Sequence, residues 1–231
     1  TATRRPLGAG DILIDVKYCG ICHTDLHQKN NDWGLGVYPM VPGHELVGLV
    51  EAMGENVPKD LFQIGMQVGI GCMVDSCMKC KACEEGHEVL CVEGNTGTYP
   101  TPVKNRKYIM DHYGSAEAFA GSTGATLGGY SNKYVCRYEF VLRIPPTLDL
   151  AQSAPILCAG ITMWEPMVDN NLKPGQTLGI VGLGGLGHMG LKLGKALGCK
   201  VVVISYSPRK KEEAQVGSLP GQQRPYRPYR P

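Results

Sequence analysis

The sequence lacks a strong net charge, a long apolar run and an N-terminal segment that resembles a signal peptide. Each of these absences argues against one class of function or location. The 231 residues carry a formal net charge of +2, which gives no electrostatic reason to expect nucleic-acid or membrane binding. The most apolar region, residues 178–204, is broken by glycines and lysines and does not resemble a membrane span. The first ten residues contain neither an apolar stretch of signal-peptide type nor an initiator Met. We expect a cytoplasmic protein whose true N-terminus lies upstream.

Cysteine, by contrast, is plentiful, with ten residues in the chain. One group of four follows the pattern C-x2-C-x2-C-x7-C and comprises Cys77, Cys80, Cys83 and Cys91. Such short loops let four sulfurs converge tetrahedrally on one zinc, at about 2.3 Å each. This crowding favours metal thiolates in a reducing compartment, with disulfides or free thiols as the alternatives. Four thiolates leave no open coordination position, so the spacing predicts a structural zinc.

A second set of possible metal ligands is spread along the chain. Cys22 lies in CGICH, His44 and Glu45 lie in PGHEL, and Cys158 lies in ILCAG. Two thiolates and one imidazole are a donor set of catalytic zinc sites, with a fourth position left for water or substrate. A buried cysteine can equally be a small hydrophobe. Spacing cannot show that residues so far apart in sequence meet.

The character of the sequence changes near Asp149. Before it, residues 11–23 read as a strand running into a Cys-bearing turn, and residues 44–54, 67–73 and 130–144 read as further strands, with glycines at the turns. After it, residues 148–168 look helical, and residues 172–205 read as strand, glycine turn, helix and strand, one βαβ unit of a parallel sheet. We expect a β-rich domain over residues 1–150 and an α/β domain over 151–214. A disordered tail rich in Pro, Arg and Tyr should follow over 215–231.

The glycine turn has the pattern G-x-G-x-x-G. It comprises Gly182, Gly184 and Gly187, with Gly185 and Leu186 between them, after the apolar strand TLGIV and before a helix expected from about His188 to Leu197. Glycines there permit a tight turn and close approach of a pyrophosphate, which rests on the helix N-terminus. The context therefore predicts a dinucleotide-binding loop.

The end of the second strand indicates the choice of cofactor. NAD-binding proteins carry Asp or Glu there to bond the ribose 2′-hydroxyl, whereas this chain has Ser205, Tyr206 and Ser207, followed by Arg209, Lys210 and Lys211. Hydroxyls and cations accept a 2′-phosphate that a carboxylate would repel. The pattern favours NADP(H), with Ser205 and Lys210 as the best 2′-phosphate contacts. The alternative is that the cations only solvate a helix start.

Taken together, these motifs resemble the zinc-dependent medium-chain alcohol dehydrogenases, in particular the cinnamyl alcohol dehydrogenase-like branch. GHELVGLVEAMGENV matches the signature G-H-E-x2-G-x5-G-x2-V, and CGICHTDLH, the four-cysteine segment, LCAGIT and GLGGLGHMG occur in the family's order. The resemblance covers about residues 11–214. It implies a β-rich GroES-like catalytic domain followed by an incomplete α/β Rossmann-type dinucleotide-binding domain, two Zn²⁺ per chain and NADP(H).

The resemblance also implies roles for individual residues. Cys22, His44 and Cys158 would ligate the catalytic zinc, with Glu45 as a nearby or alternate ligand. Asp25 would orient the His ligand, and a plain turn residue is the alternative. Thr24 and His27 would relay the alcohol proton to solvent; the alternative is a helix-capping Thr and a surface His.

The implied reaction interconverts primary alcohols and aldehydes. Lignin-type relatives tend to carry an aromatic residue where Thr96 lies, so a broad aldehyde reductase is as plausible as a cinnamyl enzyme. Trp33 and Trp164 would line the substrate pocket or pack in the core. A polyol dehydrogenase of the same superfamily and a non-catalytic zinc-binding protein are the other candidates. The expected partner is a small-molecule alcohol or aldehyde, and the complete enzyme is expected to be a homodimer.

Three departures from the family pattern matter. The chain begins after the family's first strands, residues 94–128 form a longer loop, and the dinucleotide domain stops after its second strand. A parallel sheet needs several strands with both faces covered, so a short one leaves apolar surface exposed. We expect the parent enzyme to be active and this chain alone to be inactive or poorly folded.

Overall fold

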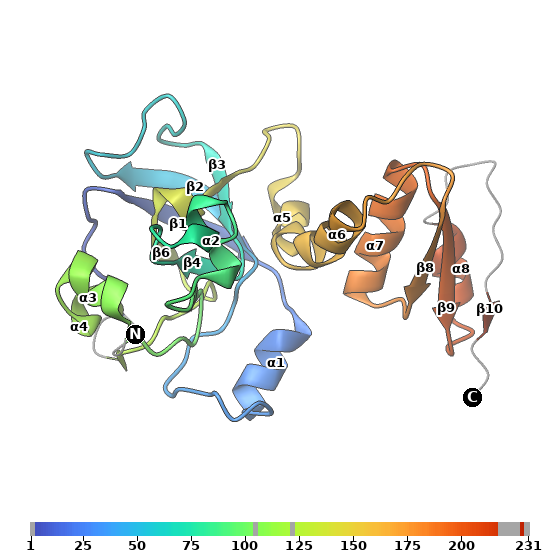
Figure 1. Cartoon of the computed structure of the whole chain (residues 1–231), viewed down its shortest axis with the longest axis horizontal. Coiled ribbons are helices and arrows are strands. Elements are labelled where there is room, and N and C mark those ends of the chain that lie inside the picture. Colours follow the sequence, from blue (N-terminus) through green and yellow to red (C-terminus); the bar gives the residue numbers. More distant parts are fainter. Residues whose placement is uncertain (1–2, 104–105, 121–122, 217–226, 229–231) are drawn as a thin grey trace. The chain divides into compact units, whose positions relative to one another are not determined.

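An antiparallel sheet organises the first part of the chain in the computed structural model, which describes residues 3–103, 106–120, 123–216 and 227–228. The strand order is β6-β1-β2-β3-β7. The strands are β1 (Asp11–Cys19), β2 (Leu46–Met53), β3 (Gln67–Ile70), β6 (Lys133–Arg137) and β7 (Leu142–Arg143). Every neighbouring pair is antiparallel. The segments 11–23 and 44–54, expected to contain strands, thus hold β1 and β2, which pair and lie side by side in Figure 1.

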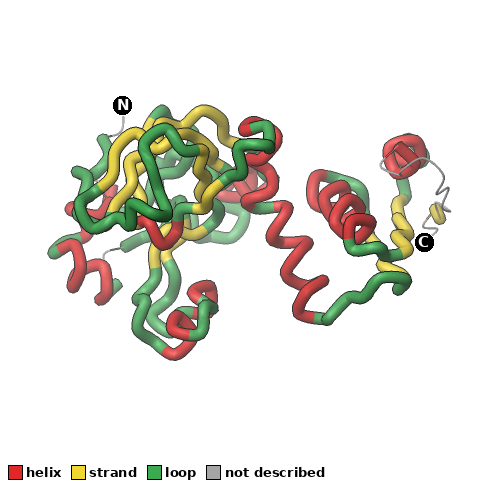
Figure 2. Tube along the Cα trace, turned by 90° about the horizontal axis from the view of Figure 1, so that it is seen from above, coloured by secondary structure: helices red, strands yellow, loops and turns green. Residues whose placement is uncertain are grey.

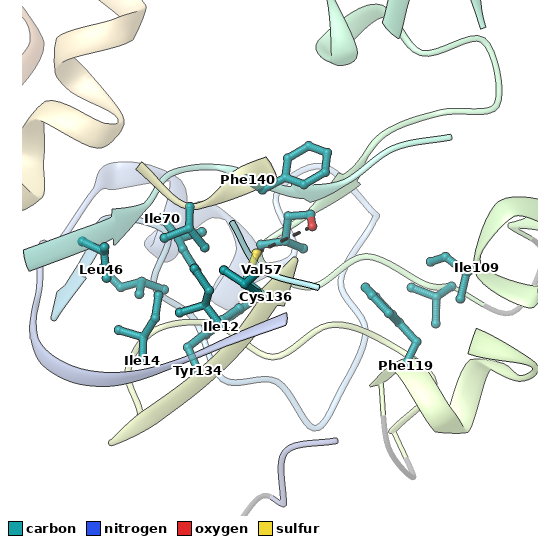
Figure 3. Packing of buried hydrophobic residues seen from close by; sticks show 14 of the residues in the cluster. Ile12, Ile14, Leu46, Val57, Ile70, Ile109, Phe119, Tyr134, Cys136 and Phe140 are labelled. Carbon is teal, nitrogen blue, oxygen red and sulfur yellow. Dashed lines mark hydrogen bonds between the residues drawn. The ribbon is translucent and has the colours of Figure 1, made fainter. Parts of the chain in front are cut away.

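The core of this unit lies against the sheet. Ile12 and Ile14 alternate along β1 and are fully buried, as are Leu46 and Ile70 on the neighbouring strands. Figure 3 shows these four side chains in one group. Each such side chain stabilises the fold by about 1.5–3 kcal/mol through burial. The apolar residues that alternate in the sequence of β1 are thus the ones whose side chains face the core.

Residues 94–128, expected as a long loop, contain regular structure. The strands β4 (Met73–Asp75) and β5 (Thr96–Gly97) pair with each other, and the helices α3 (Lys107–Tyr113) and α4 (Ala116–Ala120) follow. Ile109 and Phe119 of these helices are buried and lie beside each other in Figure 3. Their burial explains why the described part of the segment expected as a longer loop forms helices. In segment 130–144, the turn η3 (Tyr138–Phe140) separates β6 from β7, and buried Phe140 holds it against the core.

The chain divides into two compact units after Cys158, Thr1–Cys158 and Ala159–Pro231. The expected boundary near residue 150 is therefore too early. The short helices α5 (Leu150–Ser153) and η4 (Ala154–Leu157) belong to the first unit, because Ala154 and Leu157 are buried with Val47 of β2. Residues 148–168, expected to be helical, therefore contain three short helices: α5, η4 and α6. None of the helices in the described residues is long and apolar enough to cross a membrane.

The second unit is built around one βαβ unit. Helix α6 (Ala159–Asp169) leads through a loop into β8 (Thr177–Val181), as Figure 2 shows, and α7 (Gly185–Ala196) and β9 (Lys200–Ser205) follow. β8 and β9 are parallel, and Ile180, Leu191, Val201 and Val203 form a small core. The helix expected from His188 begins at Gly185. Val181 at the end of β8 remains 83% exposed.

The expected disordered tail over 215–231 falls mostly outside the described residues. Where the structure describes it, the chain is regular. Helix α8 (Lys210–Val216) extends to Val216, and β10 (Arg227–Pro228) pairs in parallel with the end of β9.

Candidate metal centres and dinucleotide loop

Four sulfurs converge in the segment that follows β4. Cys77, Cys80, Cys83 and Cys91 each offer a sulfur, and all four sulfurs lie within 4.8 Å of one another. The Sγ–Sγ distance is 3.9 Å between Cys77 and Cys83 and 3.5 Å between Cys80 and Cys83. A tetrahedral zinc with bonds of about 2.3 Å places its sulfurs about 3.8 Å apart, whereas a disulfide bond is about 2.05 Å long. All ten cysteines are free thiols. The geometry therefore fits a closed, four-thiolate metal site.

Short helices bring these cysteines together. Cys80 immediately precedes α2 (Lys81–Glu84), Cys83 lies within it, and Cys91 follows the turn η1 (Glu88–Leu90). Hydrogen bonds from the backbone of Cys83 and Val92 lower the pKa of Cys80 to about 6. Burial, in contrast, raises the pKa of Cys83 and of Cys91, and a metal ion would favour the thiolate form of all four cysteines.

The second set of ligands also comes together, although it spans the whole first unit. Cys22 precedes helix α1 (His23–Asn30), His44 and Glu45 precede β2, and Cys158 follows η4. Their ligand atoms lie within 4.8 Å of one another, and the Sγ atoms of Cys22 and Cys158 are 3.9 Å apart. Cys22 is half-buried and the other three are buried. Sheet strand β2 and the two flanking helices thus place four donors around one point.

The surroundings of the His44 imidazole indicate which kind of ligand this group of four donors would bind. The imidazole Nδ1 and Nε2 are both buried, and neither makes a hydrogen bond among the described residues, although Nδ1 lies 3.3 Å from Asp25 Oδ1. A buried polar atom without a partner is costly. Burial lowers the pKa of His44, but the Asp25 carboxylate and the Cys158 sulfur outweigh burial and raise it to about 10. The surroundings therefore favour positive charge here, and a zinc ion bound at Nε2 would satisfy both the charge and the unpaired atom.

Asp25 ties the two loops that carry Cys22 and His44. Its Oδ2 accepts the N–H of Cys22 at 3.0 Å, and its Oδ1 accepts the N–H of Gly43 at 3.0 Å. His44 Nδ1 lies 3.3 Å from Asp25 Oδ1. The hydroxyls of Tyr99 and Tyr130 donate to the same carboxylate. Burial raises the pKa of Asp25, but these hydrogen bonds outweigh it and hold the pKa well below its usual range.

Three side chains beside this site were not expected from the sequence. Tyr99 and Tyr130 lie 74 and 105 residues from Asp25, so no local pattern indicates them. The exposed Cys72 lies beside Cys158, and a hydrogen bond between the two thiols lowers the pKa of Cys72. Proximity across the fold is the only signal that identifies these residues.

Helix α1 carries the expected proton-relay residues. Thr24 is half-buried in its first turn, and His27 follows one turn later. His27 Nδ1 lies 2.7 Å from Asp32 Oδ2, and the ring of half-exposed Trp33 lies 5.1 Å from that of His27. Asp32 was not expected from the sequence, because nothing in its local pattern marks it. Trp33 is therefore not a core residue and lies beside the expected relay histidine.

The structure also describes the surroundings of Thr96 and Trp164. Thr96 is fully buried, with its hydroxyl bonded to that of Tyr108, so its side chain is a core group. Trp164 lies on α6 of the second unit and is 39% exposed.

The glycine pattern forms the expected turn in the second unit. Gly182 has a positive φ of 83°, which a side chain rarely adopts. A Cβ at Gly187 would lie 2.1 Å from the carbonyl oxygen of Gly182. Gly184 precedes α7, and Gly185 and Leu186 open it. The first N–H groups of this 12-residue helix therefore face the turn, the arrangement that binds phosphate.

The end of β9 carries the residues expected at the ribose. Ser205 is buried, and its hydroxyl accepts the N–H of Ser207 at 3.2 Å. Tyr206 is 85% exposed. Lys210 Nζ lies 2.9 Å from the carboxylate of Glu213, one turn further along α8. The lysine expected to contact a 2′-phosphate is thus paired with a carboxylate in this structure.

Comparison with known proteins bears on these sites. Residues 8–146 match the alcohol dehydrogenase GroES-like domain. The chain belongs to the medium-chain alcohol dehydrogenase family. Its relatives lie in the cinnamyl alcohol dehydrogenase-like branch, and the fold is a GroES-like unit followed by the start of a Rossmann-type unit.

Among curated proteins, the chain is 46% identical over 213 residues to "Cinnamyl alcohol dehydrogenase 8" of Arabidopsis thaliana, covering 92% of this chain and 54% of that protein. It is 45% identical to "Aldehyde reductase YahK" of Escherichia coli, with 92% and 56% covered. It is also 46% identical to "Probable mannitol dehydrogenase" of Mesembryanthemum crystallinum, with 92% and 54% covered. The chain spans about half the length of the curated relatives it matches.

Solved structures show the same fold. A cinnamyl alcohol dehydrogenase of Sorghum bicolor is 44% identical with a TM-score of 0.81, covering 92% of this chain and 56% of that one. A cinnamyl alcohol dehydrogenase of Helicobacter pylori, complexed with NADP(H), is 36% identical with a TM-score of 0.78 and the same coverage.

Proposed function

We propose that this chain supplies the zinc-binding catalytic unit and the phosphate-binding start of the cofactor unit of an NADP(H)-dependent oxidoreductase. Its reaction interconverts primary alcohols and aldehydes. The observation that carries the proposal is the convergence of Cys22, His44 and Cys158 around the unpartnered Nε2 of His44. Glu45 lies within reach as an alternate donor.

The donor set of the second site fits a catalytic zinc. Three neutral or anionic ligands would hold the ion through Cys22 Sγ, His44 Nε2 and Cys158 Sγ, and the closed four-cysteine site would hold a second, structural zinc. When bound, a zinc of this kind supplies Lewis-acid polarisation of a substrate oxygen. Asp25 would orient His44 through its Oδ1, which lies 3.3 Å from Nδ1, and so leave the Nε2 lone pair for the metal.

Helix α1 provides the route for the proton. Asp32 accepts from His27 Nδ1, which leaves Nε2 of that ring to exchange a proton. The His27 side chain is 41% exposed and so reaches solvent. Thr24, one turn nearer to Cys22, passes the proton between the substrate and His27.

The second unit provides the cofactor contacts. The first turn of α7, with Gly182, Gly184 and Gly187, receives the pyrophosphate. Ser205 takes the position where NAD-binding proteins carry a carboxylate, which favours a 2′-phosphate, and Lys210 would exchange Glu213 for that phosphate. NADP(H) in the Helicobacter pylori relative supports this choice. The proposal includes a cytoplasmic location and a homodimeric complete enzyme.

Two alternatives are supported by particular observations. A polyol dehydrogenase is favoured by the relative named as a probable mannitol dehydrogenase. A non-catalytic zinc-binding protein is the other alternative, because the closed four-cysteine site would hold zinc without any catalytic role.

The test combines cofactor titration with a substrate panel on the purified 231-residue chain. Calorimetric titration should show saturable binding of NADPH that is tighter than that of NADH. Where turnover is measured, NADPH oxidation by cinnamyl-type and straight-chain aldehydes should exceed that by ketoses. Preference for ketoses would support the polyol alternative, and zinc binding without dinucleotide binding would support the non-catalytic one.

A further inference from the structure

Asp25 is the point where the two ligand-bearing loops of the second metal site meet. Its Oδ2 accepts the N–H of the ligand residue Cys22, and its Oδ1 accepts the N–H of Gly43, the neighbour of the ligand residue His44. The same Oδ1 lies 3.3 Å from His44 Nδ1. A rotation of this carboxylate would therefore disturb both loops and the imidazole at once.

Two tyrosines occupy the remaining acceptor positions of that carboxylate. Tyr130 donates its hydroxyl to Oδ2 at 2.7 Å, and Tyr99 donates its hydroxyl to Oδ1. The ring of Tyr99 also stacks on the imidazole of His44, with centroids 5.8 Å apart and an interplanar angle of 28°. A carboxylate offers about four lone-pair positions, so these donors, with the two N–H groups, leave it no freedom to turn.

The segment that carries Tyr130 is itself held firmly. The N–H of Gly129 donates to the carbonyl of Gly43 at 2.8 Å, and that of Tyr130 donates to the carbonyl of Pro42 at 3.0 Å. From the other side, the guanidinium of Arg4 donates to the carbonyl of Gly128 at 2.6 Å. The hydroxyl of Tyr130 is thus delivered from a backbone tied to the loop that ends in His44.

Tyr99 is anchored in a comparable way. The preceding residue, Thr98, donates its N–H to the carbonyl of Cys72 at 3.0 Å, and its hydroxyl donates to the carbonyl of Gly71. Tyr99 is buried, at 8% exposure. Both phenols therefore reach Asp25 from rigid, separate parts of the first unit.

We propose that Tyr99 and Tyr130 are positioning residues of the second metal site. Their hydroxyls fix Asp25 so that its Oδ1 faces His44 Nδ1, and the fixed imidazole then directs the Nε2 lone pair toward the sulfurs of Cys22 and Cys158. Partners of a metal-bound histidine commonly set ligand orientation and metal affinity in this way. This inference rests on the proposed function, because it assumes that the second site binds zinc.

The experiment removes the hydroxyls and keeps the rings. The variants Y99F, Y130F and Y99F/Y130F are made in the 231-residue chain and loaded with zinc. The matched control is Y134F, because Tyr134 is buried like Tyr99 and donates its hydroxyl to the carbonyl of Thr98 at 3.1 Å, beside Tyr99, rather than to Asp25. It removes a buried hydroxyl next to Tyr99 but no donor to Asp25. Zinc transfer to a chromophoric chelator measures the affinity of each site, and native mass spectrometry counts the ions retained. The Co²⁺ spectrum reports the geometry of the second site directly.

We expect the four-cysteine site to keep its zinc with unchanged affinity in every variant. The second site should lose affinity by about tenfold in Y99F/Y130F, within the range of about 10–100-fold typical for partners of a metal ligand. The Co²⁺ spectrum of the second site should change in Y99F/Y130F. The zinc affinity of each single variant should lie between those of the wild type and the double variant, and the affinity of Y134F should equal that of the wild type.

Three other results would contradict the inference. Wild-type affinity and an unchanged Co²⁺ spectrum in Y99F/Y130F would show that the backbone N–H groups position Asp25 alone. Loss of both zinc ions in that variant, but not in Y134F, would assign the hydroxyls to the fold rather than to His44. A wild-type chain that binds zinc only at the four cysteines would overturn the proposed function as well.

Discussion

Substituting Gly187 by alanine tests the close packing of the dinucleotide loop. The added Cβ would lie 2.1 Å from the carbonyl oxygen of Gly182 and 3.4 Å from the side chain of Ile180. The first contact is with backbone, so it cannot be relieved by a side-chain rotation. Helix α7 must move away from the turn by about 1 Å, and such overpacking typically costs about 1–3 kcal/mol.

Gly185 provides a matched control within the same loop. A Cβ at Gly185 meets nothing within 4 Å, and alanine is intrinsically favoured over glycine in a helix by about 1 kcal/mol. We therefore expect G185A to be neutral or slightly stabilising, although it introduces the same methyl group two residues away.

The assay is hydrogen–deuterium exchange of the amides in β8 and α7, followed by mass spectrometry. A loss of about 1–3 kcal/mol corresponds to exchange about 5–150 times faster where local opening limits exchange. NADPH titration should weaken in parallel for G187A and hold for G185A. Equal exchange in the two variants would refute the reasoning, because it would show that the approach of Gly187 to Gly182 is not tight in solution.

Further predictions concern the relay and the choice of cofactor. His27→Gln should reduce turnover at neutral pH more than at alkaline pH, because hydroxide can then take the proton that His27 passes to solvent; superimposable pH–rate profiles would count against the relay. Asp32→Asn should shift the same profile in the same sense but less, since it removes only the negative charge beside His27 Nδ1 and keeps an oxygen that can accept from it. Ser205→Asp should weaken NADPH binding, as a carboxylate repels a 2′-phosphate, and leave NADH binding equal or tighter; a parallel loss for both cofactors would indicate damage to β9 instead.

Local patterns predicted those parts of the fold that depend on neighbours in sequence. The strand at 177–181 has the bounds expected from its apolar run, and β1 lies within the segment expected as a strand running into a turn, because alternation or an apolar run reflects which side chains are buried. The glycine turn was likewise predictable, since its steric needs arise within six residues of chain. The short helices α3 and α4 were missed because they are held by burial of Ile109 and Phe119, which composition alone does not reveal.

The residues of the candidate metal site also fall into those that the sequence indicated and those that it did not. Each ligand lies in a recognisable motif, so Cys22, His44 and Cys158 were indicated even though only the fold brings them together. Tyr99 and Tyr130 were not indicated, because a tyrosine that bonds a carboxylate 74 or 105 residues away leaves no local mark. Residues that act through another residue are thus the hardest to find in a sequence.

The most direct measurement is the zinc content of the 231-residue chain, wild type and Cys22→Ala, by native mass spectrometry. Both groups of four ligands have their donor atoms within 4.8 Å of one another, so the wild type should carry two zinc ions. Cys22→Ala should carry one, retained by the four cysteines. A wild type with a single zinc, or a Cys22→Ala variant that still carries two, would contradict the assignment of the catalytic metal site.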